Sequence, residues 1–177
     1  MIRVMIGVRF CAVLLFLVSL NGNVSANESR SHTLAPGDVI SVDVKNEPEL
    51  KVSRVQIPEN GTVSLPLIGR VELMRKTPQQ AQAMITERYF KDYLKQPSVE
   101  LSVDQFRPFY IDGKVNAPGS FNFSEGLTVS SAIEQAGGFA NDADRAAITL
   151  LFETSLTGPV PAGLDDTVMP GDVITVN

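Results

Sequence analysis

Hydrophobic and polar residues alternate over many short segments of this chain, which is typical of β-strands with one buried face. Two of these segments follow the same turn signal, Pro36-Gly37-Asp38 in one place and Pro170-Gly171-Asp172 in the other. Proline fixes φ, glycine adopts positive φ, and aspartate accepts hydrogen bonds from the turn backbone. We therefore predict a turn followed by a strand at 36–43 and again at 170–176. The residues expected to face the core in these two strands are Ile40, Val42, Ile174 and Val176.

The remaining alternating segments predict further short strands. Residues 56–66 are expected to form a strand, a tight turn and a second strand, because Asn60-Gly61 is a strong β-hairpin signal. Other strands are predicted at 67–73, 98–103, 108–115, 120–123 and 147–152.

Helical periodicity predicts two helices. The first begins after Thr77, a favourable N-cap, with Pro78 at the first helical position and Gln80 placed to complete a capping box. It ends before Pro97, since the residue before proline disfavours the α-conformation. Thr128 can cap a shorter helix that runs to Ala136. The predicted buried stripe of the first helix is Ala81, Met84, Ile85 and Tyr89.

These elements predict an α+β fold made of two small β-rich units, each with one main helix. The first unit spans 34–104 and the second 105–177. Gly137-Gly138 is expected to end the second helix in a left-handed conformation.

Residues 1–26 have the pattern of a secretory signal peptide. Arg3 and Arg9 precede eleven mostly apolar residues, and small residues precede a cleavage position after Ala26. Eleven residues are too few for a membrane-spanning helix, which needs about 20. The exported protein would then begin with a flexible segment at 27–33 that leaves His32 in solvent.

Charge and residue types exclude several functions. The net charge is −5, and without the signal peptide 13 Lys and Arg face 20 Asp and Glu, a net charge of −7. Such a chain lacks the basic surface that nucleic-acid binding requires. Cys11 lies in the signal peptide, and His32 is the single histidine. We expect neither a disulfide, a catalytic residue, a metal site nor a cofactor.

Acidic pairs leave one enzymatic alternative, a glycan-cleaving enzyme with two carboxylates. The close pairs are Asp165-Asp166, Asp142 with Asp144, and Glu47 with Glu49, all in segments rich in Pro, Gly or Asn. Asp142 and Asp144 could also be considered as calcium ligands. For all of these carboxylates, a role in a turn or a helix cap is the better interpretation. Tyr110 is predicted to point away from the core and is the candidate for contact with a glycan.

Several motifs, taken in order, resemble the Wza-type family of bacterial polysaccharide export proteins. They are turn and backbone motifs, so their residues are expected to shape the chain rather than to do chemistry. The matching segments are Pro36-Gly37-Asp38, Asn60-Gly61 through Pro66 to Gly69, Gln96-Pro97-Ser98-Val99, Gly113 with Pro118-Gly119, Ala136-Gly137-Gly138, and Gly171-Asp172-Val173-Ile174.

The resemblance implies a polysaccharide-export domain at 34–104 and an SLBB (soluble-ligand-binding β-grasp) domain at 105–177. It further implies a homo-oligomeric ring that carries capsular polysaccharide or exopolysaccharide through the periplasm, next to a Wzc-type inner-membrane co-polymerase. The sequence differs from the family pattern, because it has no lipoprotein cysteine, no C-terminal membrane helix and a single β-grasp unit.

We therefore expect a periplasmic protein, soluble or peripherally associated with the outer membrane, that works with a separate outer-membrane component. The alternative is a monomeric periplasmic adaptor that binds a saccharide or a partner protein.

Overall fold

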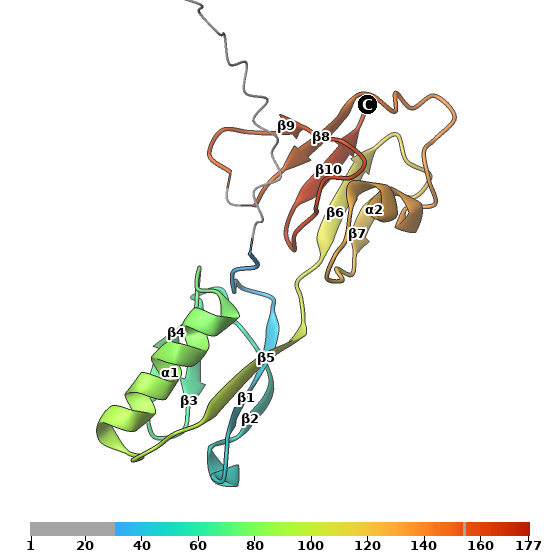
Figure 1. Cartoon of the computed structure of the whole chain (residues 1–177). Helices are drawn as coiled ribbons and strands as arrows, with labels where there is room; N and C mark the ends of the chain where they lie inside the picture. Colours follow the sequence, from blue (N-terminus) through green and yellow to red (C-terminus); the bar gives the residue numbers. More distant parts are fainter. Residues whose placement is uncertain (1–30, 154) are drawn as a thin grey trace, which may run out of the picture.

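The computed structural model describes residues 31–153 and 155–177, so the predicted signal peptide and residues 27–30 lie outside the described part. Over these residues the fold is α+β, as the sequence predicts, with two β-sheet units and two α-helices (Figure 1). We call residues 34–105 the N-terminal unit and residues 109–177 the C-terminal unit. Each unit has its own hydrophobic core.

The N-terminal unit contains a three-stranded antiparallel sheet in the order β2-β1-β5 and a separate hairpin of β3 and β4. Ile40 and Val42 of the central strand are buried, which confirms the predicted alternation. The elements are β1 (Val39–Val44), the short 3-10 helix η1 (Pro48–Leu50), β2 (Val52–Gln56), β3 (Thr62–Leu65), β4 (Gly69–Glu72), α1 (Pro78–Asp92) and β5 (Val99–Gln105).

Helix α1 forms as its sequence predicts. The Thr77 hydroxyl accepts a hydrogen bond from the Gln80 N–H at 3.2 Å, and the Gln80 side chain accepts one from the Thr77 N–H at 3.0 Å. The capping box thereby satisfies two N–H groups that have no partner within the helix. Ala81, Ile85 and Tyr89 are buried in the first core, and Met84 packs partly buried against it.

The predicted hairpin at 56–66 is wrong. Strand β2 pairs with β1, whereas β3 pairs with β4, so the Asn60-Gly61 turn joins strands of different sheets. Ile57 continues the β1–β2 pairing through its N–H, which donates to the Asp38 carbonyl at 2.8 Å. Pro58 has no N–H and cannot extend that ladder, so the chain leaves the sheet there. The hairpin turn lies instead at 66–68, where Leu67 adopts a φ of 63°.

The C-terminal unit is a five-stranded mixed sheet in the order β7-β6-β10-β8-β9. The last strand of the chain is central, because β10 runs parallel to β6 and antiparallel to β8. Helix α2 contributes Val129, Ala132 and Ile133 to the core on one face of this sheet. The elements are β6 (Phe109–Gly113), β7 (Gly119–Phe121), α2 (Val129–Gln135), β8 (Ile148–Leu151), β9 (Val160–Pro161) and β10 (Val173–Val176).

Gly113 allows β6 to approach β10 closely. It has a φ of 86°, and a Cβ at this position would lie 2.0 Å from the Val176 carbonyl oxygen. Gly138, which follows α2, has the same φ of 86° with no atom within 4 Å of such a Cβ. The two glycines therefore share backbone strain and differ in steric contact.

We predict that Gly113→Ala destabilises the C-terminal unit far more than Gly138→Ala. The latter costs about 1 kcal/mol in free energy of unfolding for a strained φ alone. Gly113→Ala adds a backbone clash that separates two central strands. Urea denaturation at pH 7 measures both values, and equal losses in the two variants would contradict the close approach of β6 and β10.

Candidate functional site: the junction of the two units

The two Pro-Gly-Asp turns have the same internal hydrogen bonds. The Asp38 N–H donates to the Ala35 carbonyl at 3.2 Å, and the Asp172 N–H donates to the Met169 carbonyl at 3.1 Å. Each carboxylate also accepts a hydrogen bond from the residue three positions earlier, Asp38 Oδ2 from Ala35 N–H at 3.1 Å and Asp172 Oδ2 from Met169 N–H at 2.9 Å. The predicted turn, with aspartate bonded to its backbone, is confirmed in both places.

Each turn glycine also fixes a neighbouring segment. The Gly37 N–H donates to the Ile57 carbonyl, and the Gly171 N–H donates to the Pro108 carbonyl, both at 2.9 Å. Gly37 has a φ of 97° and Gly171 a φ of 86°, which confirms the predicted positive φ at both. The second turn is thereby attached to the segment between β5 and β6, which connects the two units.

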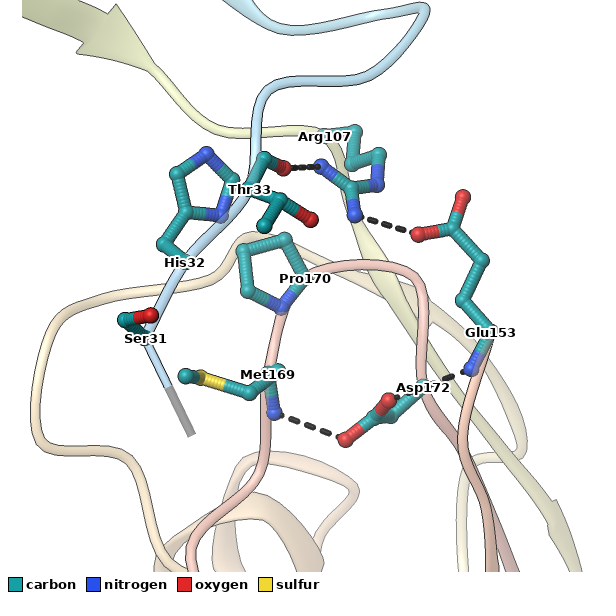
Figure 2. A pocket seen from close by; sticks show the side chains of 8 residues that line it. All are labelled: Ser31, His32, Thr33, Arg107, Glu153, Met169, Pro170 and Asp172. Carbon is teal, nitrogen blue, oxygen red and sulfur yellow. Dashed lines mark hydrogen bonds and ion pairs between the residues drawn. The ribbon is translucent and has the colours of Figure 1, made fainter. Parts of the chain in front are cut away.

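Arg107 lies in this connecting segment and reaches both units. Its backbone N–H donates to Asp38 Oδ1 at 2.9 Å, and its Nη1 donates to Asp38 Oδ2 at 3.0 Å. Its Nη2 donates to the Glu153 carboxylate of the C-terminal unit (Figure 2). The Arg107 side chain is 9% exposed, so one buried guanidinium bridges a carboxylate of each unit.

The second Asp also meets Glu153. The Glu153 N–H donates to Asp172 Oδ1 at 3.4 Å. A Cβ added to Gly171 would lie 3.0 Å from Arg107 Nε, and one added to Gly37 would lie 3.3 Å from Arg107 Cβ. Both turn glycines therefore leave room for the arginine. We call Asp38, Arg107, Glu153 and Asp172 the junction cluster.

His32 lies at the same junction, which corrects the expectation that it is solvated. Its side chain is 14% exposed, and its Nε2 lies 3.1 Å from Asp38 Oδ2. Its ring meets Phe106 edge to face at a centroid distance of 4.9 Å, and Phe106 meets Phe123 in the same way at 5.2 Å. Phe123 belongs to the C-terminal unit, so this aromatic row crosses the junction.

The Asp38 carboxylate is fully buried, and its surroundings favour the charged form. Burial alone would raise the pKa of Asp38. The contact with His32, the backbone N–H and guanidinium of Arg107, and the Ala35 N–H outweigh burial, so this pKa lies below its ordinary value. The charge of Asp38 is therefore part of the folded structure at neutral pH.

A cavity of about 240 Å³ borders the junction cluster. It is smaller than most pockets for small molecules, which start near 300 Å³. The charged residues that line it bind one another, since Arg107 pairs with Glu153 and the Glu153 N–H donates to Asp172. The arrangement is therefore suited to holding the two units in place. The lining residues are Ser31, His32, Thr33, Arg107, Glu153, Met169, Pro170 and Asp172.

Three of the other acidic residues considered from the sequence serve turns or surface pairs. Asp144 accepts a hydrogen bond from the Ala146 N–H at 2.9 Å, and Asp166 accepts one from the Gly163 N–H at 2.8 Å. Asp142 lies 3.3 Å from Lys114 Nζ. Within 31–153 and 155–177, no group of three or more His, Cys, Asp or Glu is placed to hold a metal ion.

The motif residues are spread over both units, and only the two Pro-Gly-Asp turns come together at the junction. Tyr110 lies elsewhere, on β6, and is 44% exposed, as the sequence predicts. The motif residues outside the junction are Gly61, Pro66 and Gly69 around β3 and β4, Pro97 before β5, Gly113, Pro118 and Gly119 around β6 and β7, and Gly137 and Gly138 after α2.

Sequence analysis missed Arg107 and Glu153. A signal was present, because two repeated Pro-Gly-Asp turns placed an aspartate at the start of a buried strand in each unit. A buried carboxylate needs a cation or several hydrogen-bond donors. Arg107 is the one basic residue between β5 and β6.

We predict that Asp38→Asn lowers the free energy of unfolding by about 3 kcal/mol at pH 7, because it leaves the buried Arg107 guanidinium without its charge partner. Because the pKa of Asp38 is lowered on folding, its stabilisation is present above about pH 4 and is lost as the pH falls through the folded pKa. The variant should therefore show a flatter stability profile between about pH 5 and pH 2. Asp43→Asn, which removes an exposed pair with Lys51, is the control and should cost no more than about 1 kcal/mol.

We predict that Arg107→Met uncouples the two units. Methionine keeps an apolar stem of similar length and loses every side-chain hydrogen bond to Asp38 and Glu153. Differential scanning calorimetry should resolve two unfolding transitions in this variant and a single one in the parent protein. Arg88→Met removes an exposed arginine that donates to the Arg70 carbonyl, and it should leave one transition. A single, unshifted transition in Arg107→Met would show that the cluster does not couple the units.

Comparison with known proteins gives a family for each unit. Residues 26–104 match the family described as polysaccharide biosynthesis/export protein, and residues 108–160 match the SLBB domain. Arg107 falls between the two matched segments.

One curated relative is the exopolysaccharide production protein ExoF of Rhizobium meliloti (strain 1021). It is 31% identical over 81 residues, which is 45% of this chain and 19% of that protein. The chain thus matches about a fifth of that relative's length. In the described residues, no helix is both long and apolar enough to cross a membrane. The chain therefore carries a polysaccharide biosynthesis/export domain at 26–104, followed by an SLBB domain at 108–160.

Proposed function

We propose that this protein is a non-catalytic periplasmic component of exopolysaccharide or capsular polysaccharide export. In this function it forms or completes an oligomeric conduit that guides the polymer across the periplasm towards the outer membrane. The observation that carries the proposal is an export domain and an SLBB domain held together by the junction cluster. A buried ionic joint fixes the angle between two domains, and repeated subunits need a fixed angle to close into a ring.

Exposed apolar residues on the N-terminal unit support a homo-oligomer. Phe90 and Tyr93, at the end of α1, are 62% and 51% exposed, and Leu67 in the β3–β4 turn is 56% exposed. The Tyr89 hydroxyl donates to the Pro66 carbonyl at 3.0 Å, which brings this turn against the end of the helix. Three large apolar side chains at one end of a unit favour contact with another protein surface.

The remaining parts of the proposal rest on the sequence. The signal-peptide pattern at 1–26 supports a location in the periplasm, to which we add peripheral association with the outer membrane. On the basis of the family resemblance, we propose a Wzc-type co-polymerase in the inner membrane and a separate outer-membrane component as partners. No cofactor is required, because the function is passage of a finished polymer.

We predict that native mass spectrometry of the purified protein detects a closed homo-oligomer, and that Phe90→Glu with Tyr93→Glu shifts it to monomer. Two carboxylates would be unfavourable in a contact that excludes water. Leu156→Glu is the matched control, because Leu156 is fully exposed on the other unit at 101%. A monomer at every concentration of the parent protein would favour the alternative, a monomeric adaptor that binds a saccharide or a partner.

We also predict that deletion of the protein abolishes release of the surface polysaccharide by the producing cells. Re-expression of the parent chain should restore release. Re-expression of the Phe90→Glu/Tyr93→Glu variant should not, because the conduit requires assembly. Polymer in the culture medium, measured as hexose after hydrolysis, gives the result. Unchanged release in the deletion strain would contradict a role in export.

A further inference from the structure

The five-stranded sheet of the C-terminal unit has one face that neither α-helix of the described chain covers. Core residues alternate along its strands and face α2, as Phe109 and Ile111 do on β6 and Ile174 and Val176 on β10. The residues between them point to the opposite face, because successive side chains of a strand alternate. On β6 these are Tyr110, 44% exposed, and Asp112, also exposed.

Strand pairing arranges this opposite face in two rows. Val173 pairs with both Tyr110 and Leu151, so an apolar row crosses three neighbouring strands. Thr175 pairs with both Asp112 and Thr149, which gives a polar row beside it. Ser120, opposite Tyr110 on β7, and Pro161, opposite Thr149 on β9, extend the rows and are exposed.

The composition of these rows suits a sugar chain better than a protein surface. A pyranose ring has an apolar face that stacks on an aromatic ring and an edge of hydroxyl groups that need donors and acceptors. Tyr110 supplies the aromatic ring, and Asp112, Thr175 and Thr149 supply a carboxylate and two hydroxyls next to it. Cores of protein interfaces are poor in aspartate and serine, which this face carries.

The negative charge of the C-terminal unit favours uncharged sugars over anionic ones. Residues 105–177 carry three Lys and Arg against nine Asp and Glu, a net charge of −6, whereas residues 34–104 have a net charge of −1. Asp112 lies in the polar row itself, and no Lys or Arg is among the eight residues of the two rows. A polyanion would be repelled here, whereas uncharged sugars would not.

We infer that this sheet face is a binding platform for an uncharged stretch of polysaccharide, with Tyr110 stacking on a hexose ring and Asp112, Thr175 and Thr149 hydrogen-bonding its hydroxyls. The inference rests on the proposed export function and adds the surface that the polymer contacts. Tyr110 and Asp112 are exposed to solvent on this face, so we expect it to bind weakly. Weak binding is what a conduit requires, because the polymer must move on.

Nuclear magnetic resonance titration tests the platform. The probe is cellohexaose, an uncharged hexamer of glucose, added to ¹⁵N-labelled protein at up to about 10 mM, which saturates a site with a dissociation constant of about 1 mM. Amide shifts should concentrate on Tyr110, Asp112, Thr149, Val173 and Thr175. An anionic oligogalacturonate of similar length should bind at least several-fold more weakly at low salt.

Two substitutions of one residue give the sharpest comparison. Tyr110→Ala should weaken cellohexaose binding about fivefold through loss of the stacked ring, whereas Tyr110→Phe should keep it within about twofold. Leu164→Ala, which removes an apolar side chain of similar exposure (41%) from the same unit outside the two rows, should leave binding unchanged. Tyr110 is a surface residue, so these variants are expected to fold. Amide spectra that match the parent spectrum away from residue 110 verify this.

Three outcomes would overturn the inference. The first is that cellohexaose causes no amide shifts, or causes them away from this face. The second is that Tyr110→Ala and the parent protein bind cellohexaose equally. The third is a lower native mass of the Tyr110→Ala assembly, which would identify this face as a subunit contact. The deletion strain separates this inference from the function it rests on. Suppose that deletion abolishes polymer release, that the Tyr110→Ala variant restores release fully, and that this variant binds cellohexaose as well as the parent protein does. In that case only the platform is rejected, and the export function stands.

Discussion

Among the residues that the structure describes, Arg107 is the one buried cation, and the arrangement of the two units depends on it. Its guanidinium and backbone N–H satisfy the fully buried Asp38 of the N-terminal unit, and the same side chain pairs with Glu153 of the C-terminal unit. Apart from these ion pairs, the two hydrophobic cores are connected by a few residues of chain and by the aromatic row of His32, Phe106 and Phe123. Since a buried charge without a partner is strongly unfavourable, the position of the second unit is coupled to the folding of the first.

The repeated Pro-Gly-Asp turn explains why this joint lies where it does. In each unit the turn starts the strand that occupies the middle of its sheet, β1 in one and β10 in the other. In each, aspartate closes the turn and glycine leaves space on the side of Arg107. The same local turn, used twice, therefore places two carboxylates at the point where the units meet, beside the cavity of about 240 Å³. His32 lines this cavity and packs edge to face on Phe106.

The charged side chains at the junction are paired with one another, so the surfaces available for function lie elsewhere. The end of α1 carries the exposed aromatic residues that suit contact between subunits, and the open face of the five-stranded sheet carries the rows around Tyr110. A fixed angle between the units would hold these two surfaces in a constant relation in every subunit. That is a physical requirement for a conduit, in which each copy must present the same surface to the polymer.

The sequence by itself determined the local structure. Thr77 and Gln80 predict the start of α1, Pro36-Gly37-Asp38 predicts its turn, and strand alternation predicts which residues are buried, because each depends on neighbours within a few positions. The tertiary structure decided the rest. Only the folded chain shows that β2 pairs with β1 and β3 with β4, and that β10 is the central strand of its sheet. The same holds for the contacts of His32 and Arg107, which involve residues up to about 74 positions apart. No local pattern contains those pairings, since the free energy that selects them comes from burial of apolar side chains and from the pairing of strand edges and buried charges when the whole chain has folded.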